Sequence, residues 1–179
     1  MNVSMSAREQ TVLRSALETC KRYAEYGSGG STCLAASIPA VESIVSIESD
    51  PVFASTVQQL CPRATVRWVD LGVISGYGHP RDESHRYAWP TYSNQEFEAP
   101  DLILVDGRFR VACICNSLRR YPGATLLVHD FTGRPEYHSV LQVADVLETV
   151  DTLVRLRRKP QADDATIQAL YEAYQFEQA

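Results

Sequence analysis

Residues 23–32 read YAEYGSGGST and contain the clearest local signal for the fold class. Its first part has the character of a short strand, and glycines interspersed with hydroxyl residues follow directly. Glycine in a strand-to-helix turn lets backbone N–H groups approach a ligand closely. The helix predicted over 31–38 would point its partially positive end at the same place. The stretch therefore predicts a turn that binds a phosphate or carboxylate, and the alternative is a tight corner without a ligand.

Outward from this turn, apolar stretches alternate with helical patterns along the rest of the chain. This alternation is typical of a doubly wound, mostly parallel α/β sheet with helices on both faces. The link Asp151-Thr152 is too short for a parallel crossover, so the last two strands are predicted to pair antiparallel. Strands are expected at 23–26, 43–47, 64–69, 101–105, 124–128, 145–150 and 153–158, and helices at 4–21, 31–38, 51–60, 111–121, 136–143 and 165–176, with a helical turn at 94–98.

The composition fits a single domain over residues 1–179. Of the 179 residues, 45% are hydrophobic and 22% charged, which is ordinary for a globular protein. Lys and Arg number 17 against 22 Asp and Glu, and the net charge of -5 makes nucleic acid a disfavoured partner. No run approaches the roughly 18 apolar residues of a membrane span, and the N-terminus does not resemble a secretory signal. We expect a cytoplasmic protein without a membrane partner, whose five cysteines are reduced structural thiols.

Polar residues follow the first five predicted strands. In parallel sheets, ligands bind at the carboxyl ends of the strands, near the point where the strand order reverses. Here these ends carry Gly27-Ser28-Gly29, Glu48, Asp70, Asp106 and His129-Asp130. An acidic residue in the position of Glu48 can accept hydrogen bonds from both hydroxyls of a ribose. The strand ends together predict a site for a nucleoside that is attached to an anionic group.

Two residues near the turn discriminate between nucleoside cofactors. A nicotinamide dinucleotide favours Gly-x-Gly-x-x-Gly, and Thr32 stands at the third glycine place. The carboxylate of Glu25 would repel a pyrophosphate, but it can accept hydrogen bonds from an ammonium group. A ligand with an adenosine end and an amino-acid end fits better, which indicates S-adenosylmethionine. A nicotinamide-dependent reductase is the disfavoured alternative.

The segment EYGSGGS, residues 25–31, resembles the first motif of the class I S-adenosylmethionine-dependent methyltransferases. DLILVDG and ATLLVHDF resemble their fourth and fifth strands, and the terminal antiparallel pair resembles their reversed last strand. The resemblance covers residues 4–159 and implies a Rossmann-like, seven-stranded sheet with S-adenosylmethionine as cofactor. The cofactor-binding residues expected on this basis are Glu25, Gly27, Ser28, Gly29, Ser31, Glu48, Asp70, Leu71 and Asp106.

The resemblance indicates the cofactor far better than the methyl acceptor. Methyl transfer requires positioning of the acceptor and exclusion of water, and a hydroxyl acceptor also needs a base or metal for its proton. Asp106, His129 and Asp130 are the candidate catalytic residues, with Arg108 nearby. We expect a small-molecule acceptor that is methylated at oxygen. The alternative is a catalytically inactive, methyltransferase-like domain that binds nucleosides or a partner.

A divalent metal held by Asp106 and Asp130 is a weaker alternative for catalysis. The resemblance extends to small-molecule O-methyltransferases that hold a metal between the carboxylates after the fourth and fifth strands, and oxygen ligands suit magnesium. Those enzymes usually have Asp-Asn after the fifth strand, whereas Phe131 follows Asp130 here. Arg108 also stands near the place where related sugar and antibiotic methyltransferases often have a histidine. A metal is therefore not favoured.

The segment 72–100 has no sustained period and is rich in glycine, proline and aromatic residues. Loops of this length inside a compact domain are usually functional or disordered. We predict a substrate lid in which His79 or His85 supplies a base near neutral pH. The alternative is a surface excursion whose aromatic residues pack locally or against a second subunit. The aromatic residues in 171–176 likewise pack either on the sheet or in a homodimer.

Overall fold

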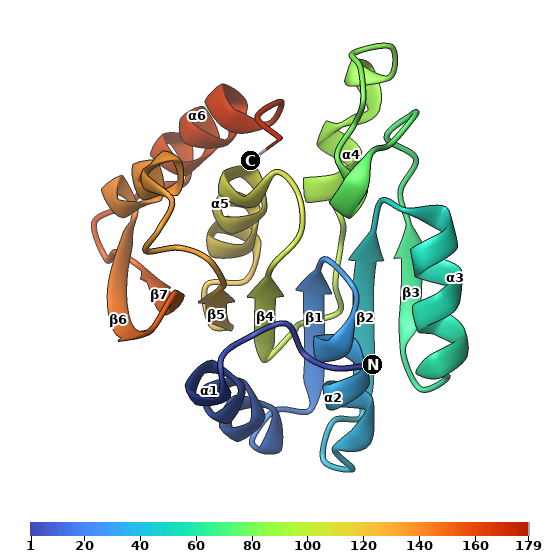
Figure 1. Cartoon of the computed structure of the whole chain (residues 1–179). Coiled ribbons are helices and arrows are strands. Elements are labelled where there is room, and N and C mark those ends of the chain that lie inside the picture. The colour runs from blue at the N-terminus through green and yellow to red at the C-terminus, as the bar shows by residue number, and fades with distance from the viewer. Residues whose placement is uncertain (179) are drawn as a thin grey trace.

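Seven strands form one mixed sheet in the order β3-β2-β1-β4-β5-β7-β6 in the computed structural model, which describes residues 1–178 (Figure 1). Strands β1 to β5 run parallel, whereas β7 pairs antiparallel with both β5 and β6. The predicted Rossmann-like sheet and its reversed last strand are thereby confirmed. The strands are β1 Arg22–Tyr26, β2 Ser43–Glu48, β3 Thr65–Trp68, β4 Leu102–Val105, β5 Thr125–Val128, β6 Ala144–Val150 and β7 Leu153–Arg158.

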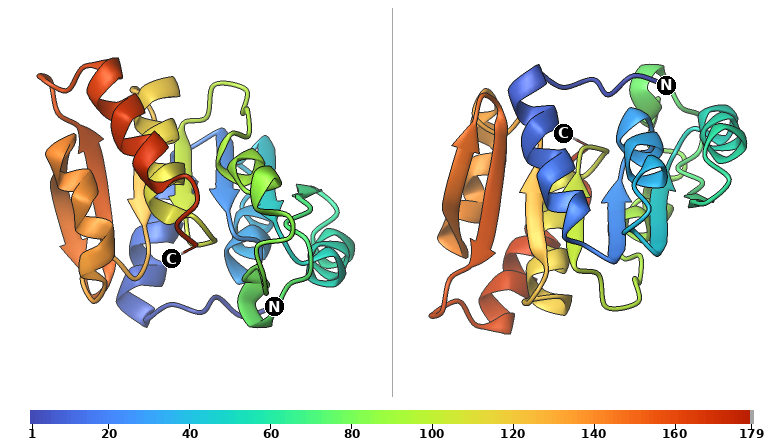
Figure 2. Two further views of the ribbon diagram at one scale, coloured as in Figure 1. Left: turned by 90° about the horizontal axis from the view of Figure 1, so that it is seen from above. Right: turned by 90° about the horizontal axis from the view of Figure 1, so that it is seen from below.

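Helices cover both faces of this sheet, as the two views in Figure 2 show. Helices α1, α2 and α3 lie on one face, and α5 and α6 pack together on the other. The α-helices are α1 Ala7–Glu18, α2 Gly30–Ser37, α3 Pro51–Leu60, α4 Pro90–Ser93, α5 Arg110–Arg120 and α6 Asp164–Tyr174. Three 3-10 helices accompany them, η1 Gly76–Gly78, η2 Arg86–Ala88 and η3 Pro135–Gln142.

The central strand β4 is covered on both faces, as its continuous apolar run predicts. Leu102 and Leu104 pack into the hydrophobic cluster on the α1 side of the sheet. Ile103 and Val105 pack into the cluster on the α5 side. All four side chains are buried, so the burial of β4 fixes the position of the turn that follows it.

Two helical expectations differ from the structure. The turn expected at 94–98 lies earlier, as α4, because Pro90 takes the first helical position, where its missing N–H removes no hydrogen bond. The α-helix expected at 136–143 is the 3-10 helix η3, which also has a proline in its first turn. Both differences lie outside the sheet, so the strand ends stay where the sequence predicts them.

Cys33 and Cys61 form a disulfide, and the expectation of reduced thiols throughout was wrong for this pair. Cys33 lies in α2 and Cys61 ends α3. The packing of these two helices brings the two Cα atoms to 5.5 Å, a separation that suits a disulfide. The pair is separated by 28 positions in the sequence, so no local spacing marks it. The free cysteines in residues 1–178 are all buried, namely Cys20, Cys113 and Cys115.

The inserted segment 72–100 is anchored in the core by its second half. Trp89, Tyr92 and Phe97 are buried in the hydrophobic cluster on the α5 side of the sheet. These aromatic residues therefore pack locally, as the alternative interpretation held. Tyr77, at the tip of the segment, is 94% exposed, so the lid remains a prediction for the tip alone.

The C-terminal helix α6 is also part of the core. Tyr171 is buried in the cluster on the α5 side, and Tyr174 and Phe176 pack against that cluster. The chain's own core therefore buries Tyr171 and partly covers Tyr174 and Phe176, and a homodimer remains a prediction. No helix in residues 1–178 combines the length and the apolar character that crossing a membrane requires.

Candidate functional site

A cavity of about 740 Å³ opens at the carboxyl ends of β1, β2, β4 and β5. Its volume falls in the usual range for sites that bind small molecules. The N-terminal residues 1–4 and part of the inserted segment complete its wall. The lining includes most of the predicted site residues, namely Gly27, Ser28, Gly29, Ser31, Glu48, Asp106, His129 and Asp130.

The turn after β1 is tight because Gly27 adopts a φ of +92°, a conformation that favours glycine. Its N–H donates to the Ile47 carbonyl at 2.8 Å. A Cβ at this position would lie 2.7 Å from the backbone of Gly107. The turns after β1 and β4 are therefore in direct contact. A Cβ at Gly30 would overlap the carbonyl group of Asn2, because the N-terminal residues cross over the start of α2.

Glu25 lies behind the glycine turn and does not line the cavity, so a contact between its carboxylate and an ammonium group remains a prediction. It is fully buried, and it accepts hydrogen bonds from the Tyr23 and Ser31 hydroxyls, both at 2.7 Å, and from the Thr32 hydroxyl. Burial raises the pKa of Glu25, and these hydroxyl bonds partly oppose the increase. The carboxylate thus ties β1 to the first turn of α2 and supports the glycine turn from inside.

Glu48 lines the cavity at the end of β2 and faces the glycine turn. Its Oε2 accepts hydrogen bonds from the Ser28 N–H at 3.2 Å and the Ser28 hydroxyl at 3.0 Å. Its Oε1 accepts from the backbone N–H groups of Ser49 at 2.7 Å and Asp50 at 3.0 Å. The carboxylate is therefore held in one orientation beside the glycine turn, at the wall of the cavity.

Three other sequence candidates lie outside the cavity lining. Asp70 is exposed and accepts a hydrogen bond from the Gly72 N–H at 2.9 Å. Leu71 is buried in the hydrophobic cluster on the α5 side. His85, one of the two candidate bases of the inserted segment, packs against Tyr87 instead. A contact between Asp70 or Leu71 and the adenine remains a prediction.

Arg110 places a guanidinium group between the carboxylates that follow β4 and β5. Its Nη2 lies 3.2 Å from Asp106 Oδ1 and 3.6 Å from Asp130 Oδ2. Its Nη1 donates to the His129 carbonyl at 2.6 Å, and its Nε donates to the Gly107 carbonyl at 3.0 Å. Because the side chain is only 3% exposed, this cation is a fixed part of the cavity wall.

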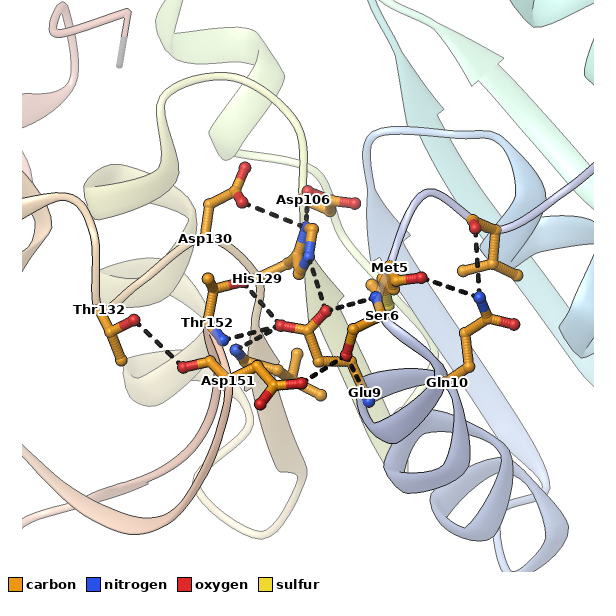
Figure 3. A network of polar contacts seen from close by, with 12 residues as sticks. Met5, Ser6, Glu9, Gln10, Asp106, His129, Asp130, Thr132, Asp151 and Thr152 are labelled. Atoms are coloured by element: carbon orange, nitrogen blue, oxygen red, sulfur yellow. Dashed lines mark hydrogen bonds and ion pairs between the residues drawn. The ribbon is translucent and has the colours of Figure 1, made fainter.

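Glu9 of α1 reaches the same cluster from the N-terminal helix (Figure 3). Its Oε2 lies 3.5 Å from His129 Nε2, and His129 Nδ1 lies 3.1 Å from Asp106 Oδ1. Glu9 Oε1 accepts from the N–H and hydroxyl groups of Thr152, at 2.8 and 2.7 Å. The imidazole of His129 is therefore clamped between a carboxylate of α1 and one at the end of β4.

The contacts between Glu9, His129 and Asp106 shift the pKa values of Glu9 and His129. Burial alone would lower the pKa of His129, but the hydrogen bond to Asp106 and the surrounding negative charges outweigh burial and raise the pKa. Burial alone would raise the pKa of Glu9, but hydrogen bonds from Thr152 and Ser6, together with the charge of His129, lower it to about 2. The surroundings of His129 thus favour its protonated form more than water does.

Glu9 should make the stability of the fold depend on acidity. A carboxyl group whose pKa falls from 4.5 to about 2 on folding stabilises the protein above pH 4.5, and this stabilisation is lost as the pH falls towards 2. The loss is on the order of 3 kcal/mol. We expect the Tm of Glu9→Gln to depend less on pH in this range than that of the wild type, while the exposed-site control Glu18→Gln follows the wild type. Parallel profiles for Glu9→Gln and the wild type would contradict this assignment.

His79 of the inserted segment is the other imidazole that lines the cavity. Burial lowers its pKa, and the positive charge of Arg108 lowers it further, while a hydrogen bond with Gln178 partly opposes the decrease. Three non-glycine residues at or next to the cavity have a strained, left-handed backbone. They are Tyr77, Phe109 and Asp130, with φ values of 61°, 52° and 57°. Non-glycine residues in this conformation concentrate at functional sites.

Solved structures of other proteins resemble the chain over most of its length. A methyltransferase-like protein from Silicibacter pomeroyi DSS-3 superposes with a TM-score of 0.86 and 28% sequence identity, over 99% of this chain and 98% of that one. A TehB-like SAM-dependent methyltransferase from Corynebacterium glutamicum superposes with a TM-score of 0.55 and 13% identity, over 87% and 90%. No protein-family model matches the chain, and no curated protein matches it.

The strand order, the reversed β7 and the cavity at the strand ends define the class of protein. It is a Rossmann-like protein of the methyltransferase type, in which the turns after β1, β2 and β4 meet at one cavity. Its fold is that of the class I S-adenosylmethionine-dependent methyltransferases, and the chain is similar to a methyltransferase-like protein over nearly its whole length.

Proposed function

We propose that the protein binds S-adenosylmethionine and transfers its methyl group to an oxygen of a small-molecule acceptor. The observation that carries this proposal is the convergence of the Gly27 turn and the Glu48 carboxylate on one cavity. The turn suits the amino-acid end of the cofactor, and Glu48 suits the ribose. The two similar structures, one described as methyltransferase-like and the other as a SAM-dependent methyltransferase, support methyl transfer. The net charge of -5 and the volume of about 740 Å³ support a small acceptor over nucleic acid.

Asp130 is the carboxylate best suited to accept the proton of an acceptor hydroxyl. S-adenosylmethionine supplies an electrophilic methyl group, so the acceptor needs only alignment and loss of its proton. Asp106 Oδ1 is engaged by both His129 and Arg110 within 3.2 Å. Within residues 1–178, the cations around Asp130 lie 3.6 to 3.9 Å from its oxygens, beyond hydrogen-bond distance, so these oxygens are free to accept a hydrogen bond. We assign proton transfer to Asp130 and positioning to Asp106 and His129.

Transfer of a labelled methyl group to a panel of small hydroxylated and carboxylated metabolites tests this function. We expect a labelled product, and Asp130→Asn should lower kcat about 100-fold or more. Asparagine is the matched substitution because Asp130 has a φ of 57°, which asparagine tolerates. The affinity for S-adenosylhomocysteine should stay unchanged in this variant, since Glu48 and the Gly27 turn are intact.

Other outcomes would favour the competing functions. S-adenosylhomocysteine binding without transfer to any acceptor would favour an inactive, methyltransferase-like binding domain. Binding of NAD without binding of S-adenosylhomocysteine would favour a nicotinamide-dependent reductase. Full activity of Asp130→Asn would leave methyl transfer in place and remove Asp130 from the mechanism.

The carboxylates around Arg110 do not fit a bound divalent metal. Asp106, His129 and Asp130 do offer ligand atoms within 4.8 Å of one another. However, the Arg110 guanidinium already lies between the two carboxylates, and His129 Nδ1 is directed at Asp106. A divalent ion placed there would meet a fixed positive charge at close range.

We therefore expect no metal dependence. With S-adenosylhomocysteine bound, neither magnesium nor EDTA should shift the Tm by more than about 1 °C, because a ligand that does not bind the folded state cannot stabilise it. Sodium chloride at matched ionic strength is the control for screening. A rise in Tm with magnesium that EDTA reverses would contradict this expectation and restore the metal as a candidate.

A further inference from the structure

Arg108 is a buried cation without an acidic partner at the wall of the cavity. The residue is only 9% exposed, and it lines the cavity. Its Nε has no hydrogen-bond partner within residues 1–178, and its guanidinium forms no ion pair with any carboxylate in that part of the chain. Burial and the nearby Arg110 lower its pKa, but a guanidinium remains charged in proteins. A buried charge of this kind is costly unless a counter-charge neutralises it.

The acidic groups on the same wall already have partners. Glu48 accepts hydrogen bonds from three backbone N–H groups and a hydroxyl. Asp50 accepts from the first N–H groups of α3. The two carboxylates that follow β4 and β5 both contact Arg110. Arg110 is thus surrounded by acceptors, whereas Arg108, two residues earlier, has none of these carboxylates as a partner.

His79 adds a second donor beside Arg108. Arg108 Nη1 contacts His79 Nε2. Because a guanidinium can only donate, Nε2 is the acceptor, and the neutral ring carries its proton on Nδ1. The tip that carries His79 is tied to the end of β2, since the Ser49 hydroxyl donates to the Gly78 carbonyl at 2.9 Å. The ring of His79 also has a hydrogen bond with Gln178, so the donor left without a partner in this pair is the Arg108 Nε, which suits a carboxylate or phosphate oxygen.

We propose that Arg108 and His79 form an oxyanion-binding site, and that the methyl acceptor carries the carboxylate or phosphate group that binds there. This inference rests on the proposed methyl transfer and names the chemical class of its acceptor. The carboxylate at the amino-acid end of the cofactor is another oxyanion that could bind Arg108 and His79. The amides at the start of α2, next to Gly27, supply donors for that carboxylate. His79 belongs to the inserted segment, outside the cofactor-binding turns, so we assign the pair to the acceptor.

Calorimetry with malonate and inorganic phosphate as probes tests the site. The protein is first saturated with S-adenosylhomocysteine, which fills the positions of the cofactor. At least one of the two probes should bind. Arg108→Gln should weaken the binding of that probe about tenfold or more, because the substitution removes a charge-assisted hydrogen bond. Arg81→Gln, an exposed cation of the same segment, controls for net charge and should bind the probe as the wild type does. The Tm of Arg108→Gln should not fall, because the substitution removes an unmatched buried charge.

A second ligand pair separates the two sources of the oxyanion. If Arg108→Gln weakens binding of S-adenosylhomocysteine but not of 5′-methylthioadenosine, which lacks the amino-acid end, Arg108 binds the cofactor carboxylate and the proposal is overturned. It is also overturned if neither probe binds the loaded wild type, or if Arg108→Gln binds the probes equally well. Failure of the wild type to bind S-adenosylhomocysteine would instead overturn the proposed function. The probes would then be titrated into the unloaded protein, where the same comparison of variants decides.

Discussion

Gly27→Ala should abolish measurable binding of S-adenosylhomocysteine and should also destabilise the fold. The residue has a φ of +92°, which disfavours any side chain, and its Cβ would lie 2.7 Å from the backbone of Gly107. Backbone cannot move aside as a side chain can, so the turns after β1 and β4 must separate. Strain and overpacking together amount to about 2–5 kcal/mol, or a fall in Tm of roughly 5 °C or more for a chain of this size. Calorimetry and thermal unfolding measure the two effects.

Gly123→Ala is the matched control for this substitution. A Cβ there would meet no atom of residues 1–178 within 4 Å, and Gly123 does not have a positive φ. It should bind S-adenosylhomocysteine as the wild type does and unfold at the same temperature or slightly higher, because alanine reduces the entropy of the unfolded chain. If Gly27→Ala kept the wild-type affinity while folded, the turn would not be the cofactor site.

The fold could be predicted because its signals are local in the sequence. The continuous run of β4 and the glycines after β1 each mark an element within a few residues. The short link Asp151-Thr152 predicts an antiparallel pair without any tertiary information. Once the strands are parallel, their ends meet at one edge, which places Glu48, Asp106 and Asp130 on one cavity.

The charge pattern inside the site could not be predicted in the same way, because it depends on contacts between distant segments. Glu9 carries the signature of a helix start, a capping box with Ser6, and nothing in it indicates a contact with His129. Arg110 looks like any basic residue at the start of a helix, yet it takes the position between the carboxylates. Glu25 illustrates the converse: its spacing from the turn suggested a ligand contact, but three hydroxyl groups occupy its carboxylate.

Glu48→Ala should weaken binding of S-adenosylhomocysteine about 100-fold, and Glu48→Gln about tenfold or more, because each hydrogen bond to a charged acceptor contributes about 1.5–3 kcal/mol. Alanine removes the acceptor for the ribose and also leaves the Ser28 N–H without its partner. Glutamine keeps the shape of the side chain but has a single oxygen, so it cannot satisfy both Ser28 and Ser49 as the carboxylate does. Calorimetry gives both affinities.

Glu42→Gln is the matched control, since Glu42 is exposed just before the other end of β2, and within residues 1–178 its side chain hydrogen-bonds only to Lys21. It should bind as the wild type does. The affinities of Glu48→Ala for adenosine and for S-adenosylhomocysteine are then compared. If both affinities fall, Glu48 binds the ribose, because both ligands contain a ribose. A loss confined to S-adenosylhomocysteine would place Glu48 at the amino-acid end and reverse the orientation of the cofactor in the cavity. An unchanged affinity for both ligands in Glu48→Ala would remove Glu48 from the site, and with it the argument that the strand ends after β1 and β2 bind one nucleoside together.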